Sequence, residues 1–237
     1  MKYANYRNIF RLYEYVQPFL KYSTPLEEKL PGNKVVVIAP HQDDEAIGCG
    51  GTVLKHVKNG GKLEIIFCTH DSQSRMEEAK QAAKILGSKI SHFLQFDNKT
   101  LYKQTDALSE SFTKLFLRIE PDIIFMPFAI DNHPTHIAIS KAFLKAYKQK
   151  TVKSLIYAYS IWTTLIPNVT VDISDVWPEK QKAIECYKSQ LAGRDYIKMA
   201  TSMAQYWAVV KGKNTKYCEA FLKMTAKSYV NFVRDIF

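Results

Sequence analysis

The chain has 237 residues, of which 46% are hydrophobic and 24% charged, values that are ordinary for a soluble globular protein and exclude a disordered one. Its formal net charge of +10 favours anionic partners. Because the lysines are scattered along the chain rather than gathered in one arm, nucleic acid is not expected among those partners.

The N-terminal segment, residues 1–32, is predicted to be a helical extension. Apolar side chains recur near helical spacing from Phe10 to Leu20, and Pro31-Gly32 breaks the pattern. Three roles are open for this extension: capping the sheet, pairing with another copy of the chain, or resting on a membrane surface. Residues 33–237 contain no repeat or Pro-rich linker and are predicted to form one domain.

Short apolar segments alternate with helical ones over the next hundred residues. The predicted strands are 34–39, 63–68, 90–96 and 122–127, and the predicted helices are about 45–58, 75–86, 106–118 and 137–148. Glycines at 60, 61 and 87 end two of the helices. This alternation predicts an α/β fold: a Rossmann-like three-layer sandwich with a mostly parallel sheet.

Polar clusters follow three of the predicted strands, at residues 41–45, 69–78 and 131–136. In a parallel sheet, ligands bind beyond the carboxyl ends of the strands, where these loops converge. The three clusters are therefore expected to form one shared site.

The first cluster places His41, Asp43 and Asp44 directly after a β-branched apolar run. Such side chains are costly to bury without a partner, and a bound cation is the usual partner. The pair His133 and His136 offers one or two further imidazoles. Two histidines and one carboxylate leave positions open for water and substrate, as in a catalytic zinc site, although such ligands also accept iron or cobalt.

Other residues near these clusters have supporting or structural interpretations. Asp43, next to the ligands, is expected to stay free as a general base on a water that zinc acidifies. Asp131 either caps the following helix or orients an imidazole. His56 and His92 have no motif around them and are expected to be structural.

The cysteines and the hydropathy pattern bear on the cellular setting. Cys49, Cys68, Cys186 and Cys218 are widely spaced, which favours buried thiols over disulfides or a thiolate zinc site. No stretch approaches the ~20 apolar residues of a membrane helix, and the N-terminus lacks an apolar signal-peptide core. A cytoplasmic protein without a transmembrane segment is expected.

Together these motifs resemble the PIG-L/LmbE-like zinc-dependent N-acetylglucosaminyl deacetylases. The family signature, a strand followed by Ala-His-Pro-Asp-Asp-Glu and later by His-x-x-His, corresponds here to residues 40–45 and 133–136. Further agreement lies at residues 75–87, 94–97, 172–174, 187–190 and 217–221, so that the likeness covers about residues 33–223.

The resemblance implies a role for each matching residue. Zinc would be held by His41, Asp44 and His136; Asp43 would be the general base, and His133 would donate to the amide oxyanion or the leaving amine. Arg75, on the loop after the second strand, and Gln42 are expected to contact substrate, and Asp131 and Glu45 to support the ligands. The substrate would be an N-acetylglucosamine-type conjugate, for which an anionic aglycone would suit the basic chain.

Three departures from the family pattern concern the site. Gln42 replaces the usual Pro, which removes no ligand. Thr135 stands where the family commonly has Asp. The loss of that carboxylate would lower the basicity of His133 or change the partner that orients it. Residues 69–74 lack the family's glycines, so the sugar pocket is expected to differ in shape. Two alternatives stay open: a noncatalytic zinc- or sugar-binding protein, and an amidohydrolase for a different acyl group.

Overall fold

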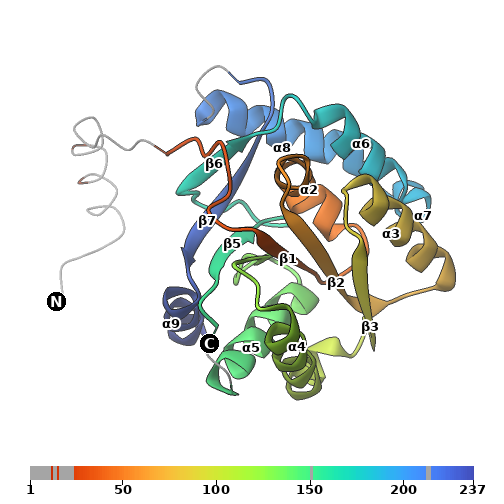
Figure 1. The fold of residues 1–237 in the computed structure, drawn as a ribbon, viewed down its shortest axis with the longest axis vertical. Helices are drawn as coiled ribbons and strands as arrows, with labels where there is room; N and C mark the ends of the chain where they lie inside the picture. Colours follow the sequence, from red (N-terminus) through yellow and green to blue (C-terminus); the bar gives the residue numbers. More distant parts are fainter. Residues whose placement is uncertain (1–11, 13–14, 16–23, 150–151, 212–214) are drawn as a thin grey trace.

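The computed structural model describes residues 12, 15, 24–149, 152–211 and 215–237 (Figure 1). Most of the predicted N-terminal helical extension lies outside these residues. Its last part, residues 24–32, is not helical: Leu26 forms a β-bridge with Thr170 at the edge of the sheet. The absence of a helix over residues 24–32 is explained by Pro25, Pro31 and Gly32, since none of them favours a helix interior.

The described residues form a sheet of seven strands in the order β3-β2-β1-β4-β5-β7-β6 (Figure 1). The strands are β1 (Lys34–Ala39), β2 (Lys62–His70), β3 (Ile90–Asp97), β4 (Ile123–Pro127), β5 (Leu155–Tyr159), β6 (Val169–Asp172) and β7 (Cys218–Thr225). Strands β1 to β5 are mutually parallel, and β7 runs antiparallel to both of its neighbours. The predicted mostly parallel sheet is confirmed.

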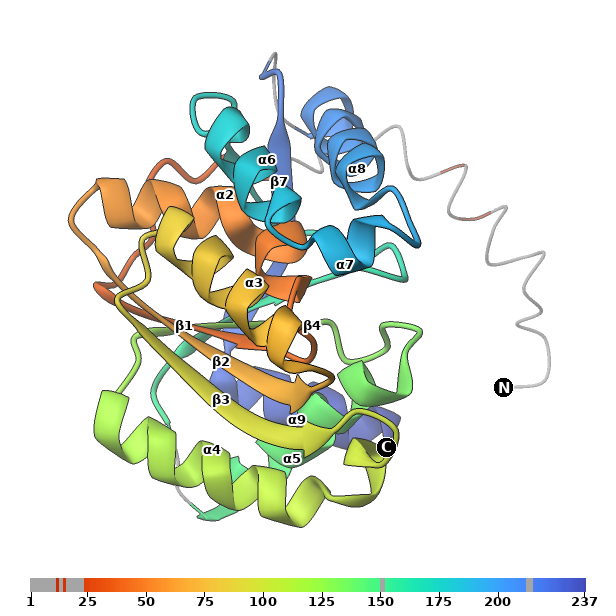
Figure 2. The ribbon, with the colours of Figure 1, turned by 90° about the vertical axis from the view of Figure 1, so that its right-hand side faces the viewer.

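Helices cover both faces of this sheet, which completes the predicted three layers (Figure 2). One face carries α2 (Asp44–Lys58), α3 (Gln73–Ile85), α6 (Trp177–Glu185), α7 (Lys188–Leu191) and α8 (Tyr196–Val210). The other carries α4 (Thr105–Ile119), α5 (Pro134–Gln149) and α9 (Ala226–Ile236). A short 3₁₀ helix, η2 (Leu101–Lys103), precedes α4.

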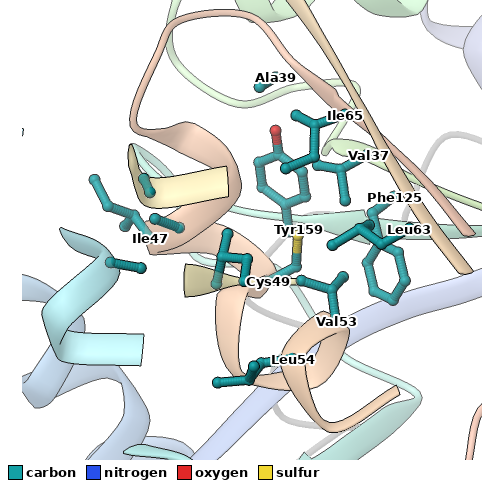
Figure 3. Close-up of a cluster of buried hydrophobic side chains, with 14 of the residues drawn as sticks. Val37, Ala39, Ile47, Cys49, Val53, Leu54, Leu63, Ile65, Phe125 and Tyr159 are labelled. Carbon is teal, nitrogen blue, oxygen red and sulfur yellow. The ribbon is translucent and has the colours of Figure 1, made fainter. Parts of the chain in front are cut away.

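Strand β1 lies inside the sheet, between β2 and β4, and its alternating side chains enter two separate cores. Val35 and Val37 pack on the α2 side, and Val36 and Ile38 on the α5 side. Burial on both faces explains the continuous β-branched run in the sequence. The α2-side core is shown in Figure 3.

Helix α2 packs closely on this core through Gly48. A Cβ atom at Gly48 would lie 2.4 Å from the ring of Tyr159, so a side chain there would collide with a fully buried residue. The hydroxyl of Tyr159 in turn donates to the carbonyl of Ile38, 2.9 Å away. These contacts place the first turn of α2 directly over the carboxyl end of β1.

Each predicted strand and helix between residues 34 and 148 is present, with ends shifted by at most three residues. Arg75 lies in the first turn of α3 rather than on a loop, because Ser72 caps that helix. Cys186 is partly exposed, unlike the other three cysteines. No described helix is long and apolar enough to span a membrane.

Candidate active site

The predicted ligands converge where β1 and β4 lie side by side. His41 follows β1, His133 directly precedes α5, and His136 lies in the first turn of α5, after β4. From β1 the chain proceeds outward to β2 and β3 and then returns to β4 on the other side of β1. This reversal separates the loops and leaves a crevice at the carboxyl ends of the strands.

The loop after β1 has a constrained backbone. Asp43, which precedes α2, has φ 140°, a value that side chains other than glycine rarely adopt. Its amide donates to Oε2 of Glu45 at 3.2 Å, and the amide of His41 donates to Oδ2 of Asp44 at 2.9 Å. The strained turn thus directs the side chains of His41 and Asp44 to one point. Such strain often accompanies function.

Three ligand atoms form a compact triangle at that point. Oδ2 of Asp44 lies 3.1 Å from Nδ1 of His41 and 3.2 Å from Nε2 of His136, and the two nitrogens are 3.4 Å apart. Zinc–ligand bonds of about 2.0–2.1 Å in a tetrahedral site give ligand–ligand separations of about 3.3 Å. The residues present therefore fit a tetrahedral metal ion with one position left for other ligands.

A second set of three side chains also meets there. Ring nitrogens of His41, His133 and His136 lie within 4.8 Å of one another. That spread is wider than a tetrahedral edge, so the triangle that includes Asp44 matches a metal ion better. His133 lies beside it, with its ring centroid 4.8 Å from that of His41.

Hydrogen bonds fix which nitrogen of each imidazole faces the triangle. Nδ1 of His136 donates to Oδ2 of Asp131 at 2.8 Å, which turns Nε2 toward the triangle. Nε2 of His41 lies 2.9 Å from Oδ1 of Asn98, which leaves Nδ1. Asp131 is itself held by the amides of residues 161 and 162. Outer contacts of this kind orient metal-binding histidines.

The triangle attracts positive charge. Burial alone would lower the pKa of His136, but the carboxylates of Asp44 and Asp131 outweigh it and raise the pKa to about 9. For Asp44, burial would raise the pKa, yet His136 and His41 bring it well below its usual range. A cation between these groups would be stabilised by both carboxylates.

His133 differs from the other two imidazoles. Burial, followed by electrostatic repulsion from the neighbouring imidazoles of His41 and His136, lowers the pKa of His133 to about 4, so its ring is neutral near pH 7. The amide of Thr135 donates to Nδ1 of His133 at 3.3 Å, so the ring proton is on Nε2. A neutral imidazole with this tautomer can donate one hydrogen bond into the pocket.

Asp43 and Arg75 form a second layer of charge beside the triangle. Nη2 of Arg75 lies 3.5 Å from Oδ2 of Asp43 and donates to the carbonyl of Gln42 at 2.9 Å; its Nη1 pairs with Asp71. Burial, followed by the charge of Asp44, raises the pKa of Asp43. A carboxylate made more basic in this way is a better proton acceptor.

Two predicted site residues lie away from the pocket. The side chain of Gln42 is fully buried and donates to the carbonyl of Thr69, so the structure does not bring it to a substrate. Glu45 accepts from the hydroxyl of Tyr187 and from the amide of Asp43, and it supports the loop backbone rather than an imidazole. Burial raises the pKa of Glu45 to about 7.

The pocket over the triangle has a volume of about 140 Å³. Besides predicted residues it is lined by Ile47, Asn98, Ile161, Trp162, Gln190 and Tyr196. Asn98 was not predicted from the sequence, although it follows β3 as the polar clusters follow their strands. Oδ1 of Asn98 accepts from Oγ1 of Thr135 at 3.1 Å, so Thr135 supports His41 through Asn98.

Comparisons with known proteins identify the family of the chain. Residues 36–147 match the family described as PIG-L: GlcNAc-PI de-N-acetylase. The chain is 31% identical over 187 residues to diacetylchitobiose deacetylase of Thermococcus kodakarensis, which covers 66% of this chain and 70% of that relative. The chain belongs to the PIG-L family. This PIG-L protein is also 27% identical over 183 residues to a probable N-acetyl-alpha-D-glucosaminyl L-malate deacetylase 2 of Bacillus cereus, covering 66% and 83% of the two chains.

A solved structure shows the same fold. N,N'-diacetylchitobiose deacetylase from Pyrococcus horikoshii superposes on this PIG-L protein with a TM-score of 0.67 and 24% identity, over 95% of each chain. The fold class predicted from the sequence is thus confirmed by a known architecture as well as by the strand order. The recognition of the family from residues 40–45 and 133–136 is confirmed too.

Proposed function

We propose that the protein is a metal-dependent deacetylase that removes the acetyl group from an N-acetylglucosamine-type conjugate. The observation that carries the proposal is the triangle of His41, Asp44 and His136, with separations of 3.1–3.4 Å beside a pocket that also holds Asp43 and His133. Two sequence relatives are a diacetylchitobiose deacetylase and a probable deacetylase of a glucosaminyl malate, which supports an amino-sugar substrate.

A zinc ion held by the triangle would polarise the acetamide carbonyl and acidify a water molecule. Two histidines and one carboxylate also accept iron or cobalt, so activity is measured with each of the three metals, beginning with zinc.

The remaining groups would handle protons and the substrate. Asp43 would take the proton of the attacking water, and the Nε2–H of His133 would stabilise the developing oxyanion. Arg75, which stays beside Asp43 in the pocket, would bind sugar hydroxyl groups through its fork of donors. The proton that Asp43 takes from the water would then pass to the leaving nitrogen as the C–N bond breaks, so that acetate and a free amine are released.

The test is amine release from a panel of N-acetylglucosamine conjugates, with Asp43→Asn as the variant. Asn keeps the shape of Asp43 but cannot accept the proton, so release should fall by at least about a hundredfold. Zinc content of both proteins is measured first, because Asp43 lies outside the triangle and the variant should keep its metal. Unchanged release by the variant would contradict the role of Asp43.

Two other outcomes would favour the alternatives. If the zinc-loaded protein binds the conjugates without releasing amine, a noncatalytic sugar-binding role replaces the proposal. If it releases amine only from larger acyl amides, the reaction class holds and the acetyl assignment fails.

A further inference from the structure

The pocket is too small to enclose a whole sugar conjugate. Its volume of about 140 Å³ is below the roughly 300–1,000 Å³ of typical small-molecule sites. The acetamido side of the sugar would fill it, and the aglycone would then lie over the rim. Residues at the rim therefore contact the part of the substrate that differs between conjugates.

One side of the rim is built by the end of α7 and the start of α8, two helices that lie on the same face of the sheet (Figure 2). Gln190 and Tyr196 both line the pocket, and Arg194 lies between them in the chain. The guanidinium carbon of Arg194 lies 4.7 Å from the ring centroid of Trp162, another lining residue. Trp162 in turn lies 6.3 Å from the ring centroid of His133, at an interplanar angle of 25°.

The charge of Arg194 is not compensated by any described carboxylate. Arg194 is exposed, and among residues 24–149, 152–211 and 215–237 no carboxylate oxygen lies within 4.0 Å of its guanidinium group. Arg75, by contrast, is paired with Asp43 and Asp71. Asp195, next in the chain, uses its side chain to cap α8. Arg194 is thus a positively charged side chain at this rim that no described carboxylate neutralises.

Its contact with Trp162 also holds Arg194 in place. A guanidinium group stacked on an indole ring is partly ordered before a ligand arrives, so less conformational entropy is lost on binding. The planar fork then presents parallel N–H donors, which suit the two oxygens of a carboxylate or phosphate. We propose that Arg194 is a specificity-determining residue that binds an anionic group, carboxylate or phosphate, on the aglycone of the sugar conjugate.

This inference rests on the proposed deacetylase function, and the experiment separates the two. kcat/KM is measured for three N-acetylglucosamine derivatives: a neutral methyl glycoside, a glycoside of a hydroxy acid, and the 1-phosphate. The variants are Arg194→Ala and Arg194→Glu. The control is Lys198→Ala, which removes one positive charge from an exposed position on α8 outside the pocket lining.

The expected result is a preference of the wild-type protein for at least one anionic derivative, and the better of the two identifies the anion. Arg194→Ala should lower the anionic-to-neutral ratio of kcat/KM by about 10- to 100-fold, as for loss of a charge-assisted hydrogen bond. Arg194→Glu should lower it further, and Lys198→Ala should leave it unchanged. An equal loss on neutral and anionic derivatives, or no preference in the wild type, would overturn the inference.

If no derivative is turned over, the proposed function fails while the inference can still be tested. Calorimetric binding of the same derivatives to the zinc-loaded protein then replaces kcat/KM. Tighter binding of an anionic derivative that disappears in Arg194→Ala would support the anion site. Equal binding by wild type and variant would contradict it.

Discussion

Lys180 and Glu219 form a buried ion pair that also bonds with the backbone of α2. Nζ of Lys180 lies 2.6 Å from Oε1 of Glu219 and donates to the carbonyl of Ile47 at 2.8 Å. Glu219 accepts from the amides of Gly51 and Thr52, each at 2.8 Å. In a regular helix the amide of Gly51 would face the carbonyl of Ile47. Side chains from α6 and β7 therefore bind the donor and the acceptor of one turn of α2.

Breaking this pair on one side should destabilise the protein strongly. Lys180→Met would leave the Glu219 carboxylate buried without its cation, at a cost of about 3–5 kcal/mol in the free energy of unfolding. The double variant Lys180→Met/Glu219→Gln removes both charges and should recover part of that loss. Urea unfolding of the three proteins measures the difference. Equal stabilities of the single and double variants would show that the buried charge is not the cause.

The hydrogen bonds behind the two imidazoles should control metal affinity. Asp131→Ala removes the acceptor of His136, and Asn98→Ala removes that of His41. Each variant should bind zinc about 10- to 100-fold more weakly, because outer partners fix the tautomer and orientation of a ligand. Competition with a chelating dye measures the affinity.

A neighbouring change provides the control for this prediction. Asn132 is exposed, follows Asp131 directly and contributes only its backbone amide to a described hydrogen bond. Asn132→Ala should bind zinc as the wild type does. If Asp131→Ala also kept its full affinity, His136 would not be a ligand oriented through Nδ1.

Structure that depends on local sequence was predictable, whereas structure that depends on pairing between distant segments was not. Strands such as residues 34–39 were predictable because burial on both faces leaves a continuous apolar run. The order of the second half was not, since β5 pairs with β7 across more than sixty residues that carry no local pairing signal. The antiparallel β7 and the helices after residue 149 thus emerged only in the structure.

The candidate site shows the same limit. That His41 and Asp44 belong to a site was predictable because ionisable side chains directly after a buried strand are unusual, whereas His136 was selected by its place in the His-x-x-His motif. Asn98 was missed because a lone amide after β3 is common in turns. Gln42 was predicted to contact substrate because of its position in the motif. Its side chain instead turns inward and donates to the carbonyl of Thr69, a contact between distant segments that the motif does not indicate.

Asp122 should make stability depend on pH at the acid end. Hydrogen bonds from the amides of Lys34 and Asn33 lower the pKa of this carboxyl in the folded state. The contribution of Asp122 to the free energy of unfolding is therefore present above the unfolded-state pKa of about 3.9. It is lost as pH falls through the lower pKa of the folded state. Asp122→Asn should lower Tm slightly at pH 7, and the gap to wild type should close toward pH 3. A gap that stays constant over this range would contradict the assignment.

The backbone strain at Asp43 predicts a conflict between stability and activity. With φ 140°, any side chain at this position is strained, whereas glycine is not. Asp43→Gly should therefore be more stable than Asp43→Ala by about 1 to 3 kcal/mol, measured by urea unfolding with metal removed by a chelator. Both variants lack the carboxylate and should lose amine release alike. Equal stability of the two variants would mean that the loop relaxes once the carboxylate is absent. The contact of Asp43 with Arg75, rather than the rest of the fold, would then be what holds the backbone at this φ.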